Sequence, residues 1–242
     1  MASVKQHYDQ LLAPCYAWMA GGWDVKIAEN RAFFHAHGVR SRGAGTAVDL
    51  GAGCGFQSIP LAESGFNVIA VDMNRSLLAQ LKKNVGRLPI VAIEDDLLNF
   101  RVHAPPTVEL IVCMGDTLTH LVSSAQVEKM IGQAFRALAE NGRLILHFRD
   151  FTRELTGLQR FIPVGSDSRR IFTCFLEYEK DTVKVHDIVY EKSAGRWTLK
   201  KSFFRKLRIC PRWTEHCLQK AGFDLEGYEV QNAMATIVAR KP

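Results

Sequence analysis

Short apolar runs alternate with amphipathic segments through the first 150 residues. The apolar runs predict strands, and the amphipathic segments between them predict helices. Alternation at this spacing predicts parallel strands joined by right-handed crossovers, which is an α/β fold. Asn141 and Gly142 predict the end of the last of these helices. The predicted strands are 46–50, 67–72, 90–94, 109–114 and 143–149, and the predicted helices are 56–64, 75–85 and 124–139.

The two ends of the chain have other patterns. Residues 3–40 read as helical, with an aromatic-rich break at 16–23. From about residue 170 the apolar period changes to two, and short polar separators predict a three-stranded antiparallel ribbon. We therefore predict one domain over 1–242, with a helical cap (1–42), a core (43–150), an inserted ribbon (170–209) and a C-terminal helix and hairpin (210–242). The ribbon strands are 171–178, 182–190 and 197–209, and a helix over 211–221 precedes strands at 224–230 and 234–240.

Three glycines follow the first predicted core strand. Asp49 lies near the end of this strand, and Gly51, Gly53 and Gly55 follow it at every second position. Glycine allows a sharp turn and close approach of a ligand to the backbone. Asp72, 17 residues beyond Gly55 at the end of the next strand, is placed to bind ribose hydroxyls. Because Asp49 would repel a pyrophosphate, we expect a cofactor that presents cationic or donor groups to this loop rather than a dinucleotide.

The motif Asp49-Leu50-Gly51-Ala52-Gly53-Cys54-Gly55 resembles the D-x-G-x-G-x-G motif of class I S-adenosylmethionine-dependent methyltransferases. The resemblance implies a Rossmann-like, doubly wound seven-stranded sheet with an antiparallel last strand. It also implies that the cofactor is S-adenosylmethionine, that the glycine loop meets its methionine part, and that Asp72 binds the ribose. An acid after the third strand would bind the adenine. We favour Asp96 with the Leu97 backbone for this role, and Asp95 is the alternative. Either acid could instead only cap the next helix.

The segment after the fourth strand, Gly115-Asp116-Thr117-Leu118-Thr119-His120-Leu121, is similar to L-G-N-S-F-A-H-L of glycine and sarcosine N-methyltransferases. Gly115, His120 and Leu121 match, and Asp116 replaces the asparagine. His120, Asp116 and His147, at the end of the fifth strand, are the catalytic candidates because an acceptor that arrives protonated must lose a proton. Each histidine also fits a structural role, and an already neutral amine or a thiolate needs no base. An N-P-P-Y sequence, typical of enzymes that methylate amide or adenine nitrogens, is missing, which disfavours a DNA-base substrate.

The N-terminal aromatic side chains are the second cofactor signal. In the family resemblance an N-terminal helical segment closes over the cofactor, and aromatic faces favour a sulfonium cation. Core packing explains the same residues without a ligand. We expect no metal site. The predicted cofactor-binding residues are Tyr8, Tyr16, Trp18, Asp49, Gly51, Ala52, Gly53, Gly55, Asp72, Met73, Asp96, Leu97, Cys113 and Met114.

Charge and composition narrow the function further. Residues 1–141 carry 12 Lys and Arg against 13 Asp and Glu, whereas residues 142–242 carry 19 against 12. The basic half fits a solvated surface or the steering of an anionic acceptor, and no Arg-rich tract with interleaved aromatics indicates nucleic acid. The candidate carboxylate clamps are Arg149, Arg153, Arg169, Arg170, Arg205 and Arg208.

The chain of 242 residues, 47% of them hydrophobic, has neither a membrane-length apolar run nor a signal pattern, so the expected location is cytoplasmic. Six cysteines without a C-x-x-C pair are expected to be buried thiols. We predict an enzyme that methylates a small polar acceptor, and an acceptor that bears a carboxylate would fit the candidate arginines. The alternatives are a nicotinamide oxidoreductase, which Asp49 disfavours, a nucleic-acid methyltransferase and a non-catalytic cofactor-binding protein. Monomer and homodimer both remain open.

Overall fold

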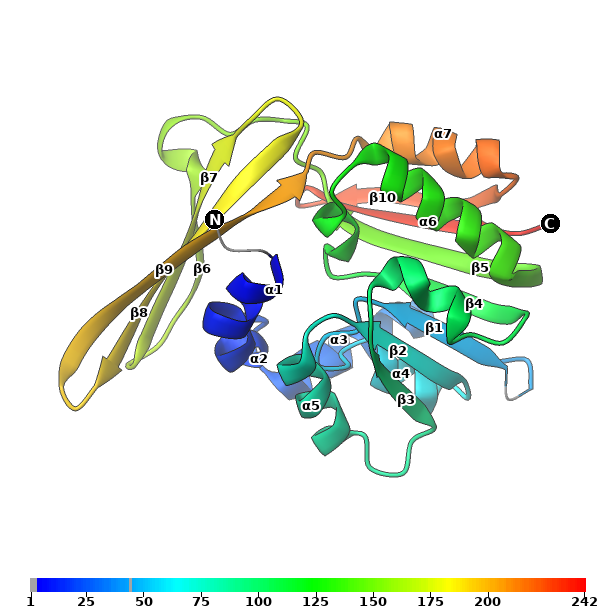
Figure 1. Ribbon diagram of the computed structural model, residues 1–242, viewed down its shortest axis with the longest axis horizontal. Coiled ribbons are helices and arrows are strands. Elements are labelled where there is room, and N and C mark those ends of the chain that lie inside the picture. Colours follow the sequence, from blue (N-terminus) through cyan, green and yellow to red (C-terminus); the bar gives the residue numbers. More distant parts are fainter. Residues whose placement is uncertain (1–3, 44) are drawn as a thin grey trace.

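The main sheet has seven strands in the order β10-β11-β5-β4-β1-β2-β3 (Figure 1). The computed structural model describes residues 4–43 and 45–242, so the predictions for residues 1–3 of the cap and for residue 44 lie outside the described residues. Strands β1 to β5 are parallel, and β11 runs antiparallel to both β5 and β10. This arrangement confirms the predicted fold. The bounds are β1 Thr46–Leu50, β2 Asn67–Asp72, β3 Ile90–Glu94, β4 Val108–Cys113, β5 Leu138–Arg149, β10 Asp224–Gln231 and β11 Met234–Arg240.

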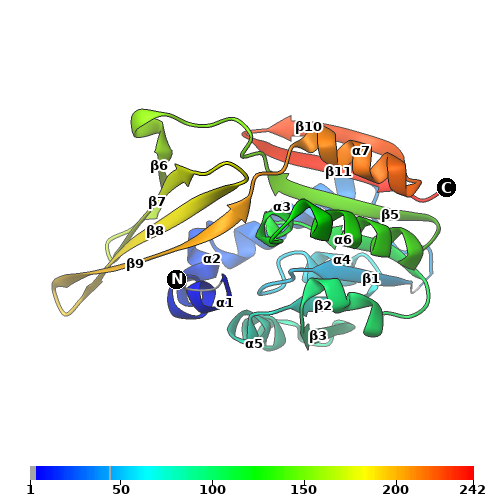
Figure 2. The same cartoon turned by 45° about the horizontal axis from the view of Figure 1, so that its top comes forward.

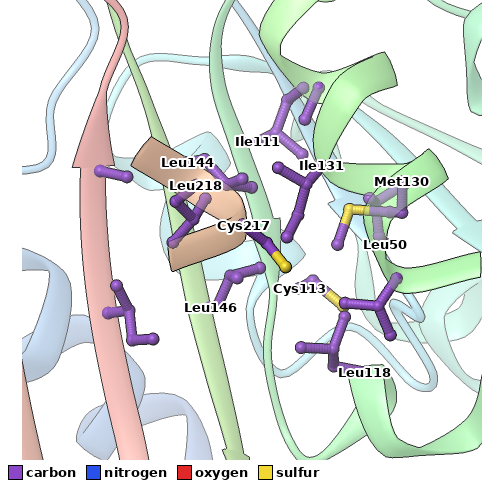
Figure 3. Close-up of a cluster of buried hydrophobic side chains, with 14 of the residues drawn as sticks. Leu50, Ile111, Cys113, Leu118, Met130, Ile131, Leu144, Leu146, Cys217 and Leu218 are labelled. Carbon is purple, nitrogen blue, oxygen red and sulfur yellow. The ribbon is translucent and has the colours of Figure 1, made fainter. Parts of the chain in front are cut away.

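Helices cover both faces of this sheet, as a doubly wound fold requires. On one face lie α3 (Trp23–Ala36), α4 (Ser58–Glu63) and α5 (Arg75–Asn84), and on the other lie α6 (Ser124–Ala137) and α7 (Pro211–Ala221). Figure 3 shows Met130 and Ile131 of α6 packed with Leu218 of α7 against strand side chains. Polar caps fix where two helices begin: the side chain of Asn74 accepts the Leu77 N–H, and that of Ser123 accepts the Gln126 N–H.

The N-terminal cap is a series of short turns rather than one helix. It consists of α1 (Val4–His7), a π-helical turn (Tyr8–Leu12), a 3₁₀ turn (Ala13–Cys15) and α2 (Tyr16–Met19). The predicted break before α3 is present, because Gly21 and Gly22 both have positive φ angles. No helix in the described ranges is both long and apolar enough to span a membrane. All six cysteines are free thiols.

The inserted sheet has four antiparallel strands, so the prediction of three is wrong. Its strands are β6 (Phe161–Ser166), β7 (Arg170–Tyr178), β8 (Thr182–Ser193) and β9 (Arg196–Leu207), in that spatial order (Figure 2). The missed strand is β6, whose Pro163 and Gly165 are poor strand formers in sequence. As an edge strand with a register shift between these two residues, β6 tolerates both.

The boundary between α6 and β5 also differs from the prediction. The helix ends at Ala137, and β5 begins at Leu138, five residues before the predicted strand. Asn141, expected to mark the helix end, lies within β5 with a φ of 59°. Pairing of Leu138 with Val108 explains the early start, because it extends the parallel ladder with β4 beyond a register shift. Three 3₁₀ turns were not predicted: Leu97–Val102, Thr117–His120 and Gly157–Arg160.

Candidate functional site

A cavity of about 190 Å³ opens at the carboxyl ends of the parallel strands, beneath the N-terminal cap. Ligands of open α/β sheets collect at this edge. The cavity brings together part of the predicted cofactor set and one catalytic candidate. Those that line it are Tyr8, Tyr16, Gly51, Gly53, Asp72, Met73, Asp96, Leu97 and His120. Those that do not are Trp18, Asp49, Ala52, Gly55, Cys113, Met114, Asp116 and His147.

The glycine loop and Asp72 form one hydrogen-bonded unit. The Gly53 N–H donates to Asp72 Oδ2 at 2.8 Å, and the Asn74 N–H donates to Asp72 Oδ1 at 2.7 Å. Burial raises the pKa of Asp72, and these two amides oppose the shift. Gly51 has a φ of 76°, and a Cβ there would lie 2.3 Å from Thr117 Cγ2. The loop therefore needs glycine at position 51 both for its backbone angle and for the close approach of Thr117.

Gly55 and Asp49 fix the glycine loop through contacts with the neighbouring helices α5 and α4. A Cβ at Gly55 would lie 2.3 Å from Leu81 Cδ1 of α5, so this glycine serves helix packing. Asp49 is buried, and its Oδ2 accepts the Ser58 hydroxyl at 2.6 Å at the start of α4. Burial raises the pKa of Asp49 to about 7, with the Ser58 hydrogen bond opposing it. Asp49, which was predicted to face the cofactor, is thus bound to Ser58 and does not line the cavity.

The acids after β3 differ in position. Asp96 lines the cavity and also caps the following 3₁₀ turn, since its Oδ1 accepts the Leu98 N–H. Asp95 instead binds His103 Nε2 at 2.7 Å and the Asn99 side chain. Of the two predicted candidates, only Asp96 is available to a ligand in the cavity.

Asp116 is the centre of a buried polar cluster and is not a free base. Its Oδ1 accepts the Arg149 N–H and the Thr119 hydroxyl, and its Oδ2 pairs with Lys206 Nζ of the inserted sheet. Burial alone would raise the pKa of Asp116, but the Lys206 ammonium and the Arg149 N–H together outweigh it and lower the pKa. A carboxylate held ionised in this way is a weak proton acceptor.

His120 is the only catalytic candidate that lines the cavity. Its Nε2 lies 3.2 Å from the Tyr8 hydroxyl, its ring stacks on Phe204 of β9, and its Nδ1 is buried without a hydrogen-bond partner. Burial, with a contribution from the nearby Lys206 ammonium, lowers the pKa of His120 to about 3. The ring is therefore neutral at physiological pH, and its Nδ1 is a buried polar atom without a partner.

His147 and the candidate arginines lie elsewhere. His147 is paired with Thr236 in the sheet, and burial lowers its pKa. Most of the arginines are bound within the protein: Arg170 pairs with Glu191, Arg205 with Glu179 and Arg208 with Glu154. Arg153 and Arg169 are exposed, and Arg149 at the end of β5 is half-buried.

The cap connects the cofactor side of the cavity with the inserted sheet. On one side Lys5 Nζ donates to the Met73 carbonyl at 2.7 Å, and the Asn74 side chain donates to Asp9 at 2.8 Å. On the other side His7 Nε2 lies 2.7 Å from Asp187 Oδ2 of β8, and both side chains are buried. Trp18 also faces the inserted sheet, where Arg170 lies over its ring.

Several of these residues were missed from the sequence. Asn74 carried a signal, because it is a helix N-cap directly after the ribose-type acid. Lys206, Phe204 and Asp187 carried no such signal, since each lies at least 84 positions from its partner in the sequence.

Comparison with known proteins gives one family match and several relatives. Residues 47–142 match the family model described as "Methyltransferase domain". A glycine/sarcosine N-methyltransferase of Parasynechococcus marenigrum (strain WH8102) is 30% identical over 139 residues, covering 56% of this chain and 48% of that protein. The chain thus spans about half the length of the curated relatives it matches.

Solved structures resemble almost the whole chain. The CcbJ methyltransferase from Streptomyces caelestis has a TM-score of 0.75 at 17% identity, covering 88% of both chains. The sugar N-methyltransferase KedS8 from Streptoalloteichus sp ATCC 53650 has a TM-score of 0.75 at 14% identity, covering 100% of this chain and 95% of the other. At these identities the likeness shows the fold.

Proposed function

We propose that this chain, which contains a methyltransferase domain over residues 47–142 and has the fold of the S-adenosylmethionine-dependent methyltransferases, methylates a small polar acceptor. The domain confirms the family resemblance drawn from the glycine motif. The observation that carries the proposal is the cavity that joins the glycine loop, Asp72 and Asp96 to His120.

The cavity residues fit S-adenosylmethionine, which supplies an electrophilic methyl group on a sulfonium sulfur. Asp72 is held by two backbone amides and keeps carboxylate lone pairs for ribose hydroxyls. Asp96 and the Leu97 backbone lie further along the same wall, where they would hold the adenine amino group. Tyr8 and Tyr16 also line the cavity, and burial raises the pKa of both phenols, so they stay neutral and exclude water around the methyl group.

The acceptor is proposed to be an amine that binds in its neutral form. A histidine with a pKa of about 3 is too weak a base to take a proton from an ammonium group, and Asp116 is already paired with Lys206. His120, whose Nε2 lies within hydrogen-bond distance of the Tyr8 hydroxyl, instead orients the acceptor at the cavity wall so that its nitrogen lone pair points toward the methyl carbon. The relatives named as glycine/sarcosine and sugar N-methyltransferases support nitrogen as the methylated atom.

Cofactor binding is tested by calorimetry with S-adenosylhomocysteine, the expected product, and with NAD. We expect binding of S-adenosylhomocysteine alone. Asp96→Ala should weaken it at least tenfold, whereas Asp95→Ala, which removes a neighbouring acid outside the cavity, should not. Binding of NAD alone, or an equal loss in both variants, would refute the assignment.

Methyl transfer is tested with labelled S-adenosylmethionine against a panel of small amines, amino acids, amino sugars and RNA. His120→Ala should lower kcat/KM while affinity for S-adenosylhomocysteine is kept, and His147→Ala, outside the cavity, is the matched control. Transfer of the label to RNA alone would refute a small-molecule acceptor and favour a nucleic-acid substrate. Binding of S-adenosylhomocysteine without transfer to any member would favour the non-catalytic alternative.

A further inference from the structure

A buried polar cluster joins the cap to the inserted sheet. The side chains of His7 in α1 and Asp187 in β8 are both buried, and His7 Nε2 lies 2.7 Å from Asp187 Oδ2. The Cys174 thiol of β7 donates to the other carboxylate oxygen at 2.8 Å. A carboxylate only accepts hydrogen bonds, so His7 Nε2 is assigned as the donor to Asp187. Within the described ranges this is the only hydrogen bond of the His7 ring.

The contact around this cluster is otherwise apolar. Leu11 and Leu12 of the cap pack with Phe172 and Phe204 of the inserted sheet in one buried core. Burying a polar pair in such a contact costs free energy, and apolar side chains of similar volume often hold a buried contact equally well. Stability alone therefore does not account for the pair. Apolar packing has no direction, whereas a hydrogen bond fixes where His7 lies along the strand.

His7 is connected to the cavity through its neighbours. Tyr8, the next residue, lines the cavity, and its hydroxyl lies 3.2 Å from His120 Nε2. The His7 ring also packs on Phe204 at 4.5 Å between ring centroids, and Phe204 stacks on His120 at 5.3 Å. His7 therefore reaches His120 on two sides, through a phenol and through a phenyl ring. A shift of His7 would move both groups that hold the cavity histidine.

We propose that Asp187 and His7 are positioning residues for methyl transfer. Their hydrogen bond sets where Tyr8 and His120 lie at the cavity. This role, which rests on the proposed function, gives the inserted sheet a part in the reaction although no described residue of β6 to β9 lines the cavity. Loss of the hydrogen bond should slow methyl transfer more than it weakens cofactor binding, because the acids assigned to the cofactor follow β2 and β3 of the main sheet.

The cap keeps its other contacts when this hydrogen bond is lost. Lys5 Nζ donates to the Met73 carbonyl at 2.7 Å, and the Asn74 side chain donates to Asp9 at 2.8 Å. The two leucines of the cap also stay in the apolar contact with the inserted sheet. We therefore expect a cap that remains folded on the cavity while His7 and the residue after it shift. The expected effect is on rate rather than on folding.

An apolar replacement of the pair tests this role. The double variant His7→Met/Asp187→Leu keeps side chains of similar size and leaves no charge unpaired. We expect kcat to fall at least tenfold while the affinity for S-adenosylhomocysteine stays within about threefold of wild type. The Tm should be at or above that of wild type. His186→Met is the matched control and should keep kcat, because it removes a histidine–carboxylate pair, His186 with Glu177 at 2.9 Å, from the opposite face of the same strand.

A conservative variant separates position from the imidazole itself. In His7→Gln the side-chain amide can still donate to Asp187, so kcat should stay within about threefold of wild type. His7→Met removes the donor and should lower kcat as the double variant does. A double variant with wild-type kcat, a fall in kcat that follows a loss of Tm, or a kcat as low in His7→Gln as in His7→Met would overturn the positioning role.

Hydrogen exchange measured by mass spectrometry gives a readout that needs no acceptor. In the double variant the amides of residues 6–12 should exchange at least about threefold faster than in wild type, and those of the main sheet should not change. Unchanged exchange over 6–12 would overturn the positioning role and leave the proposed function intact. A wild type that binds S-adenosylhomocysteine but transfers no methyl group would refute the proposed function, and the positioning role with it.

Discussion

The ion pair between Lys206 and Asp116 joins the inserted sheet to the segment after β4, next to the cavity, and its removal gives a sharp test of this contact. The Lys206 side chain is 12% exposed and the Asp116 side chain 10%. Lys206→Met keeps most of the apolar stem and removes the ammonium. It leaves the Asp116 carboxylate buried, with only the Arg149 N–H and the Thr119 hydroxyl as partners.

The expected cost follows from the burial of the carboxylate that remains. Removing one partner of a buried ion pair costs about 3–5 kcal/mol, because the other charge stays unpaired. Because Asp116 keeps two hydrogen bonds in Lys206→Met, we expect a loss of stability near the lower end of this range, at about 3 kcal/mol. For a chain of this length each kcal/mol corresponds to roughly 2–4 °C, so the Tm should fall by roughly 6–12 °C.

A double-mutant cycle separates the pair from general packing. Asp116→Asn keeps an oxygen for the Arg149 N–H and the Thr119 hydroxyl, and asparagine tolerates the φ of 72° at this position. In Lys206→Met/Asp116→Asn neither charge remains, so we expect most of the lost stability to return, with a coupling energy of about 2 kcal/mol. Lys200→Met is the matched control, because Lys200 lies on the same strand as Lys206 and pairs near the surface with Glu191 of β8. Breaking this pair should cost under about 1 kcal/mol.

The assay is urea denaturation of all four variants together with thermal melting. The reasoning fails if Lys206→Met is no more damaging than Lys200→Met. It also fails if the double variant is no more stable than Lys206→Met alone, because the loss would then come from packing rather than from the unpaired carboxylate.

Three further predictions concern the loop, its buried acid and the acceptor. Gly51→Ala should weaken S-adenosylhomocysteine binding at least tenfold, because its Cβ would meet Thr117, whereas Gly86→Ala, also at positive φ but in open space, should cost only about 1 kcal/mol of stability and keep binding. The folded-state pKa of Asp49 is raised to about 7, against about 3.9 unfolded, so its contribution to stability is full below pH 4 and is lost as pH rises through 7. Asp49→Asn should accordingly gain stability over wild type at pH 8, by up to about 4 kcal/mol, and nothing at pH 4; equal urea midpoints at pH 8 would contradict this. For an amine acceptor, kcat/KM should rise with pH up to the acceptor's own pKa, in wild type and in His120→Ala alike, and an inflection near pH 6.5 that disappears in the variant would show that His120 is a base after all.

The parallel core was predictable because each of its elements has a local signal. Apolar runs and polar caps such as Asn74 specify the strands and helix starts, and the glycine spacing specifies the turn at Gly51. Strand β6 was missed because Pro163 and Gly165 contradict the strand pattern, and only its edge position makes them tolerable. Asp49 was assigned to the ligand because its sequence position is the same whether the side chain points to the cavity or, as here, to Ser58.

The residues around His120 come from other parts of the chain than the residues predicted to bind the cofactor. The residues that match the methyltransferase domain, 47–142, contain the glycine loop, Asp72, Asp96 and His120. The side chains that fix His120 and its surroundings come from outside this segment: Tyr8 from the cap, and Phe204 and Lys206 from the inserted sheet. Under the proposed function, two chains could therefore share the residues predicted to bind the cofactor and differ in acceptor through a few substitutions on the cap and on β9. In this chain the aspartate that stands in place of the expected asparagine at position 116 is matched by Lys206, 90 residues away, so the two should be exchanged together when the acceptor preference is engineered.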